Sequence, residues 1–342
     1  MMAPQGTMSR DEFDRDERVL LKRICAAYNR ALQDEPVGYA FGATAWWKDV
    51  EAKHLGAVRD ALRSCDIGRL HSMYSGFYRN RCGHGLVRHP PGYGSDRPTQ
   101  PDRENSRVMH EDMLYRIGYW KTETGGRYGI SALAAPEVGN PIGMRVDEVF
   151  VAAGSEYQHA CADRIRSLAL TGSTVVELGG GFGHMAYFLL GMDSSLTYVG
   201  FDVPESLALC AYYLGRSRPE KRLLLYGETR NWRDCLSASD VVLMPPREMT
   251  CLPDASVDLT FSSHLVADLE PACLEAYARE MARFTRGYVI SVSIESSPGQ
   301  RDALLRAMTG RMSLLKARRL DWNLYRAPGA REWEDLYGAV HA

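Results

Sequence analysis

Short apolar runs alternate with helical patterns through the second half of the chain. Residues 174–178 are mostly β-branched or apolar and are followed by glycines, which is typical of a buried parallel strand. Residues 185–190 then have the apolar character of a helix packed on a sheet, and residues 196–201 form a second strand-like run. This alternation predicts a doubly wound α/β sheet.

Further strands are predicted downstream. Two runs compete for the next position in the sheet, residues 222–226 and residues 240–245, and the second is favoured as the core strand because another strand pattern follows it closely. Residues 312–325 provide material for a closing antiparallel pair. The remaining predicted strands are residues 257–261 and 287–294.

The first half of the chain has apolar residues at helical spacing, which predicts a mainly helical region. Gly, Pro, Arg and His are frequent in residues 79–102, which predicts a long loop. Turn residues at 138–143 indicate a boundary, so we expect a helical unit, residues 1–145, that serves as lid, substrate-binding region or dimer contact, and a catalytic unit, residues 146–342. The predicted helices are residues 18–32, 46–62, 66–78 and 150–170.

Four glycines occupy five positions, 179–183, directly after Glu177 and the first predicted strand. Glycines allow a tight turn and a close approach of the backbone to a ligand, and the following helix start offers unpaired N–H groups. The dinucleotide fingerprint would require a third glycine at 184, where the chain has His184, so a nicotinamide or flavin cofactor is disfavoured. Asp202 ends the next strand, where it can accept both hydroxyls of a ribose. An ordinary tight turn is the alternative.

The spacing Glu177-x-Gly179-x-Gly181-x-Gly183 resembles the first motif of class I S-adenosylmethionine-dependent methyltransferases. Together with residues 118–126, 201–205 and 212–214, it is similar to the sugar O-methyltransferases of bacterial natural-product and glycan pathways. The resemblance implies a Rossmann-like class I methyltransferase sheet, S-adenosylmethionine as methyl donor, S-adenosylhomocysteine as product and a hydroxyl acceptor. The expected cofactor-binding residues are Glu177, Gly179, Gly180, Gly181, Gly183, Asp202, Val203, Met244 and Ser262.

Methyl transfer to a sugar hydroxyl needs a general base, because a neutral hydroxyl is a poor nucleophile. His264 follows the predicted strand 257–261, and ligands of parallel sheets bind beyond the carboxyl ends of strands. Asp268 and Glu270 lie about one helical turn further along and could orient His264, bind sugar hydroxyls or bind a divalent metal, although the spacing requires none. We therefore expect His264 and Asp268 to be catalytic. A histidine bonded into the sheet edge and a helix-capping acid are the alternatives.

An aromatic segment, residues 117–129, combines ring faces with hydrogen-bonding side chains and a glycine turn. It suits a sugar ring or a cofactor, and equally an aromatic anchor that docks the helical region onto the sheet. Tyr157, Gln158 and His159 lie on the predicted helix before the glycine strand. The expected substrate-binding residues are Tyr119, Trp120, Tyr128, His159 and Glu270.

Composition restricts the partners. The 342 residues carry a formal net charge of -2, with no basic excess that would indicate a nucleic-acid partner. No apolar run approaches the roughly 20 residues of a membrane span, and the acidic N-terminus lacks a signal-peptide pattern, so we expect a cytoplasmic protein with a small-molecule substrate. The eight cysteines form no C-x-x-C pair and indicate reduced thiols. By analogy, a helical region of this size suggests a homodimer.

Two other functions fit the same cofactor motif. One is an N- or C-methyltransferase that acts on an amino sugar or another secondary metabolite. The other is a repurposed fold that binds S-adenosylmethionine or its product without methyl transfer. The cofactor residues do not separate these from O-methylation, whereas an acceptor panel does.

Overall fold

The computed structural model describes residues 10–35, 41, 43–87, 103–265, 269–294, 298–325, 327 and 332–340. Its main sheet has eight strands in the order β5-β6-β4-β3-β7-β8-β10-β9 within this part of the chain. The first six strands of that order are parallel, and β10 is antiparallel to both of its neighbours. The strands are β3 (Thr174–Leu178), β4 (Thr197–Phe201), β5 (Leu223–Leu225), β6 (Val241–Met244), β7 (Val257–Ser263), β8 (Thr285–Ile294), β9 (Met312–Leu320) and β10 (Glu332–Ala339).

The order of strands reverses beside β3, because β4 pairs with one of its edges and β7 with the other. This is the switch point at which open α/β sheets bind ligands. The structure confirms the predicted doubly wound Rossmann-like sheet with a helical N-terminal region. Both competing strands exist, and β6 pairs directly with β4 while β5 lies at the edge.

The parallel strands are buried on both faces, which explains their continuous apolar character. Val175 belongs to one hydrophobic cluster, whereas Val176 and Leu178 belong to a second cluster on the other face. The first face is covered by α6 (Ser155–Arg166), α7 (His184–Met192) and α8 (Pro204–Ser217), and the second by α9 (Pro271–Phe284) and α10 (Pro298–Met308). Short 3-10 segments, η4 (Trp232–Ala238) and η5 (Pro246–Cys251), flank β6.

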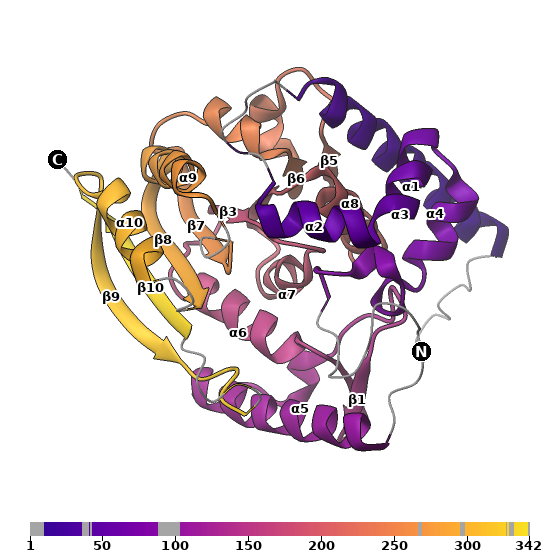
Figure 1. The fold of residues 1–342 in the computed structure, drawn as a ribbon, viewed down its shortest axis with the longest axis horizontal. Coiled ribbons are helices and arrows are strands. Elements are labelled where there is room, and N and C mark those ends of the chain that lie inside the picture. Colours follow the sequence, from indigo (N-terminus) through magenta and orange to yellow (C-terminus); the bar gives the residue numbers. More distant parts are fainter. Residues whose placement is uncertain are drawn as a thin grey trace, which may run out of the picture.

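The N-terminal helices share the first of these clusters with the sheet. They are α1 (Arg10–Gln33), α2 (Ala45–His54), α3 (Gly56–Ser64), α4 (Ile67–Tyr74) and α5 (Arg103–Glu123), with short 3-10 turns at Phe77–Arg79, Arg81–Gly83 and Ile130–Leu133. Figure 1 shows α1, α3 and α4 gathered beside α8, while α5 runs along α6. Buried hydrogen bonds join Tyr28 to Glu205 (2.8 Å) and Tyr212 to Glu17 (2.9 Å) across this contact. The division at residue 145 stays a prediction.

Two predicted helices differ from the structure. Residues 46–62 form two helices rather than one, because Leu55 ends α2 and precedes α3. Residues 150–170 begin as a strand, β2 (Val149–Ala152), which pairs with β1 (Gly143–Val146), and the helix starts only after Gly154, whose φ is 94°. A left-handed glycine between the two elements separates them, and no periodicity in the apolar residues reveals this turn.

The closing antiparallel pair differs in its second strand. β9 falls within the predicted residues 312–325, but its partner is β10, which lies between β8 and β9. Acidic residues on β10 obscure its strand pattern, since Glu334 and Asp335 are buried through ion pairs with Arg318 (2.7 Å) and Arg301 (2.5 Å). Within the described residues, no helix is both long and apolar enough to span a membrane.

Candidate functional site

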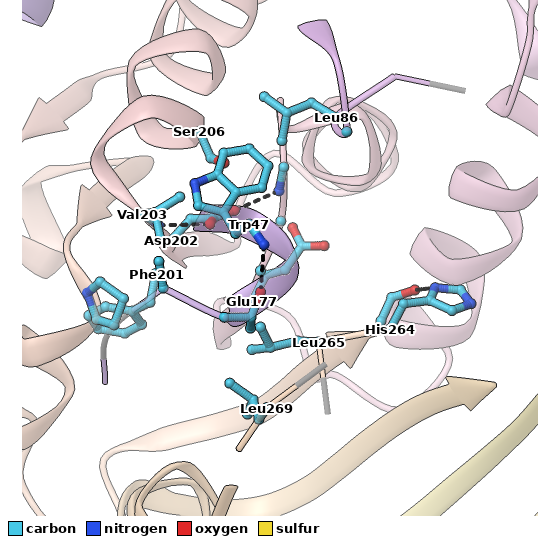
Figure 2. A pocket seen from close by; sticks show the side chains of 18 of the residues that line it. Trp47, Leu86, Glu177, Phe201, Asp202, Val203, Ser206, His264, Leu265 and Leu269 are labelled. Atoms are coloured by element: carbon cyan, nitrogen blue, oxygen red, sulfur yellow. Dashed lines mark hydrogen bonds between the residues drawn. The ribbon is translucent and has the colours of Figure 1, made fainter. Parts of the chain in front are cut away.

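A cavity of about 310 Å³ lies at the carboxyl ends of β3, β4 and β7. The turn after β3, the end of β4 and the segment after β7 form its base, and Tyr277 of α9 lies against it. The helical region contributes Trp46 and Trp47 from α2, with Gly85 and Leu86 from the loop that follows the 3-10 turns. Figure 2 shows Trp47 and Leu86 opposite Glu177 and Leu265. The position agrees with the switch point of the sheet.

The glycine turn requires its glycines for two reasons. Gly179, Gly181 and Gly183 have φ values of 73°, 59° and 85°, which side chains other than that of glycine rarely accept. A Cβ on Gly180 would lie 2.7 Å from the Glu177 Oε2 atom, and one on Gly183 would lie 2.7 Å from the Cys210 Sγ atom. Gly179, Gly180 and Gly181 line the cavity, whereas Gly183 starts α7 behind it.

Asp202 is fixed by the backbone on both of its carboxylate oxygens. Oδ2 accepts a hydrogen bond from the Gly181 N–H (2.9 Å), and Oδ1 accepts one from the Val203 N–H (2.7 Å), as the dashed lines in Figure 2 show. Burial raises the pKa of Asp202 to about 7, against the lowering effect of these two N–H donors. Each oxygen retains acceptor capacity, and the side chain is partly open to the cavity.

Glu177 is the second acid of the cavity. The hydroxyl of Tyr198 donates a hydrogen bond of 2.5 Å to its Oε2 atom. Burial raises the pKa of Glu177 to about 7, although this hydrogen bond acts in the opposite direction. Among the described residues that line the cavity there is no lysine or arginine, so no permanently charged cation there balances the two acids.

His264 lies across the cavity from Asp202, directly after β7 (Figure 2). Its backbone has φ 64°, and its N–H donates to the Val292 carbonyl (2.8 Å), which holds the residue beside β8. The ring is hydrogen-bonded on both nitrogens: Nδ1 lies 2.7 Å from Ser263 Oγ, and Nε2 lies 2.9 Å from Glu332 Oε1. A buried acid on β10 therefore orients the imidazole, as acids orient basic histidines in many active sites.

The cavity brings together much of the predicted site. His264, Glu177, Gly179, Gly180, Gly181, Asp202 and Val203 all line it. Met244 is buried at the end of β6 and Pro246 lines the cavity instead, while Ser262 is buried on β7 one residue before the lining Ser263. Glu270 is exposed at the N-cap of α9, apart from the cavity lining. Asp268 lies outside the described residues.

The tyrosines and the tryptophan predicted to bind substrate lie elsewhere, on α5 and just after it, where they contact α6 and the segment after β9. The Trp120 Nε1–H donates to His159 Nδ1 (3.1 Å), and both side chains are buried. The Tyr128 hydroxyl donates to Asp163 (2.6 Å), and the Tyr119 hydroxyl accepts from the backbone N–H of Asp321 (3.0 Å). Burial lowers the pKa of His159 to about 4, which keeps the ring neutral. These contacts have the geometry of an anchor between the helical region and the sheet.

Several lining residues were not predicted. Trp46 and Trp47 lie in a sequence segment far from the glycine motif, and their amphipathic helix pattern gave no sign of a ligand. Ser263 precedes His264 in the chain, so the sequence places it near the predicted base but does not indicate what its hydroxyl does. Glu332 lies on a strand that the pattern did not reveal. Tyr157 and Gln158, noted on the preceding helix, do line the cavity.

The described residues offer neither a cluster of metal ligands nor a disulfide. Within the described residues, no group of three or more His, Cys, Asp or Glu side chains is arranged to hold a metal ion. The eight cysteines are free, and Cys82 is buried with its thiol donating to the Met73 carbonyl (3.4 Å).

Neither protein-family models nor curated protein sequences match this chain. Among solved structures, it is similar to the [4+2]-cyclase SpnF at 11% identity and a TM-score of 0.41, over 68% of this chain and 96% of that one. It is similar to geranyl diphosphate C-methyltransferase from Streptomyces coelicolor A3(2), solved with Mg²⁺, geranyl diphosphate and S-adenosyl-L-homocysteine, at 13% identity and a TM-score of 0.39, over 66% and 98%.

A geranyl diphosphate methyltransferase in complex with SAM matches at 14% identity and a TM-score of 0.38, over 53% of this chain and 85% of that one. All three matches have low identity and a TM-score below 0.5.

Proposed function

We propose that this chain is an S-adenosylmethionine-dependent O-methyltransferase that methylates a hydroxyl of a sugar or glycosylated natural product in a bacterial biosynthetic pathway. The observation that carries the proposal is the pairing of two features in one cavity. A glycine turn with Asp202 provides a nucleoside-type site, and a histidine oriented by Glu332 lies across from it. A carboxylate that accepts ribose hydroxyls and a positioned base are what methyl transfer to oxygen requires.

The residues present fit this cofactor. The bare backbone of Gly179, Gly180 and Gly181 leaves room that side chains would fill, and Asp202 retains acceptor capacity for two ribose hydroxyls. Glu177 would lie near the ammonium and sulfonium charges, since the described lining holds no lysine or arginine that competes for it. When bound, S-adenosylmethionine supplies a methyl group on an already activated sulfonium carbon.

The chain's own contribution is alignment, proton removal and exclusion of water. His264 would remove the acceptor proton, with Glu332 holding the ring by its Nε2 atom. Trp46 and Trp47 from α2 lie over the cavity and reduce access of water. Glycine suits position 85, because its φ is 80° and a Cβ there would crowd Trp46 (3.1 Å) and Trp47 (3.4 Å).

The acceptor is expected to be uncharged. The cavity lining has two acids and, among the described residues, no lysine or arginine, so a diphosphate or carboxylate would face like charges without a partner. We expect the reaction to accept neutral glycosides and to reject nucleotide diphosphate sugars. Incubation of the protein with S-adenosylmethionine and matched pairs of glycoside and nucleotide sugar, read by the mass gain of one methylene group, tests this. Methylation of the diphosphate members alone would contradict it.

Cofactor binding itself is tested by calorimetric titration with S-adenosylmethionine, S-adenosylhomocysteine and NAD. The proposal predicts binding of the first two and none of the third. A preference for NAD, or binding of none of the three ligands, would indicate that the glycine motif is an ordinary turn. Binding of the first two without methylation of any acceptor would instead favour a fold that holds the cofactor without transfer.

Affinity for S-adenosylmethionine should depend on pH. Burial raises the pKa values of Glu177 and Asp202 to about 7, and a cationic, ribose-bearing ligand favours the ionised form of both. Below that pH each acid must lose its proton on binding, so the dissociation constant should rise by up to about tenfold per pH unit for each acid. Calorimetry from about pH 8 to about pH 6 measures this. The dependence should be shallower in Glu177→Gln, and an affinity that increases toward acid pH would contradict the assignment.

A further inference from the structure

His264 has no ring nitrogen left to meet an acceptor directly. Nε2 is bonded to Glu332 (2.9 Å) and Nδ1 to Ser263 (2.7 Å), so both ring nitrogens have partners within the protein. Glu332 is only 2% exposed, so the Nε2 side of the ring faces a buried acid rather than the cavity. The Nδ1 side faces Ser263, which itself lines the cavity.

The direction of each hydrogen bond follows from chemistry. A carboxylate only accepts, so Nε2 carries the proton and donates it to Glu332, whose Oε1 also accepts from the Asn323 amide (2.9 Å). Neutral imidazole then has Nδ1 as its acceptor, so the Ser263 hydroxyl must donate to it. The Tyr157 hydroxyl, 2.7 Å from Ser263 Oγ, therefore donates to that oxygen. Ser263 Oγ keeps one lone pair free for a further donor.

We propose that Ser263 is the residue that contacts the acceptor hydroxyl and passes its proton to His264. This inference rests on the proposed function and assigns a catalytic residue to it. Tyr157 fixes the Ser263 hydroxyl from one side, and Glu332 fixes the histidine from the other, so the relay is aligned before substrate binds. The only step it adds is one proton transfer between two atoms that are already hydrogen-bonded.

Every proton and electron pair in the relay has a defined destination. The acceptor O–H bond breaks and its proton moves to Ser263 Oγ, while the original Ser263 proton moves to His264 Nδ1. The acceptor oxygen uses the released electron pair to bond the methyl carbon as the carbon–sulfur bond breaks, and that bond's electrons stay on sulfur. The imidazolium is held by the Glu332 carboxylate and later gives its proton to water, so one proton is released for each methyl transferred.

The first test reads the histidine without any cofactor. In a ¹⁵N-histidine spectrum of the full chain near neutral pH, the His264 signals are assigned by their loss in His264→Gln. We expect the Nε2–H form, with the Nδ1 signal shifted by an accepted hydrogen bond. In Ser263→Ala the proton should stay on Nε2 while the Nδ1 signal moves to that of a free acceptor. A proton on Nδ1 in the wild-type chain would overturn the proposal.

The second test measures turnover with the neutral glycoside that the wild-type chain methylates best. Ser263→Ala should lower kcat by about 100-fold, with the affinity for S-adenosylmethionine unchanged. Ser263→Thr keeps the hydroxyl and should recover most of the rate. Ser256→Ala, directly before β7, is the control and should behave as wild type, because its hydroxyl donates to the Pro253 carbonyl (2.7 Å) and is not part of the cavity lining.

The outcomes are separable. If Ser263→Ala retains wild-type kcat, His264 takes the proton without Ser263 and the relay is wrong while the proposed function stands. If Ser263→Thr is as slow as Ser263→Ala although both bind S-adenosylmethionine normally, the hydroxyl does not carry the proton. If the wild-type chain methylates no acceptor, the proposed function is wrong, and the relay proposal, which rests on it, is wrong as well.

Discussion

Asp202→Ala should strongly weaken the binding of S-adenosylmethionine. The carboxylate would hold two ribose hydroxyls, and hydrogen bonds to a charged acceptor contribute about 1.5–3 kcal/mol each. The variant also removes the acceptor of the Gly181 and Val203 N–H groups, which shape the turn. We therefore expect affinity to fall by at least ~100-fold in calorimetric titration.

A matched control tests whether the loss of affinity is specific to Asp202 or follows from the removal of any acidic side chain. Asp240 precedes β6, at the end of the sheet away from the cavity, where it pairs with Arg222 (3.0 Å) on the surface. Asp240→Ala should leave the affinity unchanged. Both proteins must be folded, as judged by circular dichroism. If Asp202→Ala then binds S-adenosylmethionine as tightly as the wild-type chain, Asp202 does not bind the cofactor.

His264→Ala should lower kcat by about 10²–10⁴-fold, the usual contribution of a general base, while S-adenosylmethionine still binds. The ring lies beyond Ser263 at the far side of the cavity from Asp202, so its removal spares the cofactor contacts (Figure 2). Single-turnover assays with a neutral glycoside measure the loss. Glu332→Gln should show a smaller loss in kcat, because the ring stays in place but loses the charge that stabilises its protonated form.

The chain has a second histidine–glutamate pair that serves as control. His71 on α4 is exposed, and its Nδ1 atom lies 2.8 Å from the buried Glu17 of α1; neither residue lines the cavity. His71→Ala should retain wild-type kcat. Near-wild-type turnover in His264→Ala, with cofactor still bound, would show that the assignment of the base is wrong.

The glycine motif and Asp202 could be located from sequence because their signals are local. A left-handed turn needs glycine wherever it occurs, and an acid at the end of the next strand lies beside that turn in a parallel sheet. The position of His264 could be predicted for the same reason, since it directly follows a strand whose carboxyl end faces the same crevice. The alternating apolar runs likewise reflect burial of each strand on both faces.

The aromatic segment shows what composition alone leaves open. Tyr119, Trp120 and Tyr128 have the composition of a sugar site, but their polar atoms bond Asp321, His159 and Asp163 within the protein. Buried aromatic residues with a polar atom need a partner whether they bind a ligand or hold two elements together. Composition is the same in both cases, and only the packing of α5 on α6 separates them.

The sequence alone determines the alternation of strands and helices, the glycine turn and one side of the cavity. Each of these features depends on residues within a few positions of one another. The partner of His264 and the cover over the cofactor cannot be predicted in this way, because Glu332 and Trp47 come from distant segments brought together by the sheet and its first hydrophobic cluster. β10 in particular enters between β8 and β9, and its acids are tolerated there only through partners on other elements. Long-range pairing of this kind leaves no periodic trace in the chain itself.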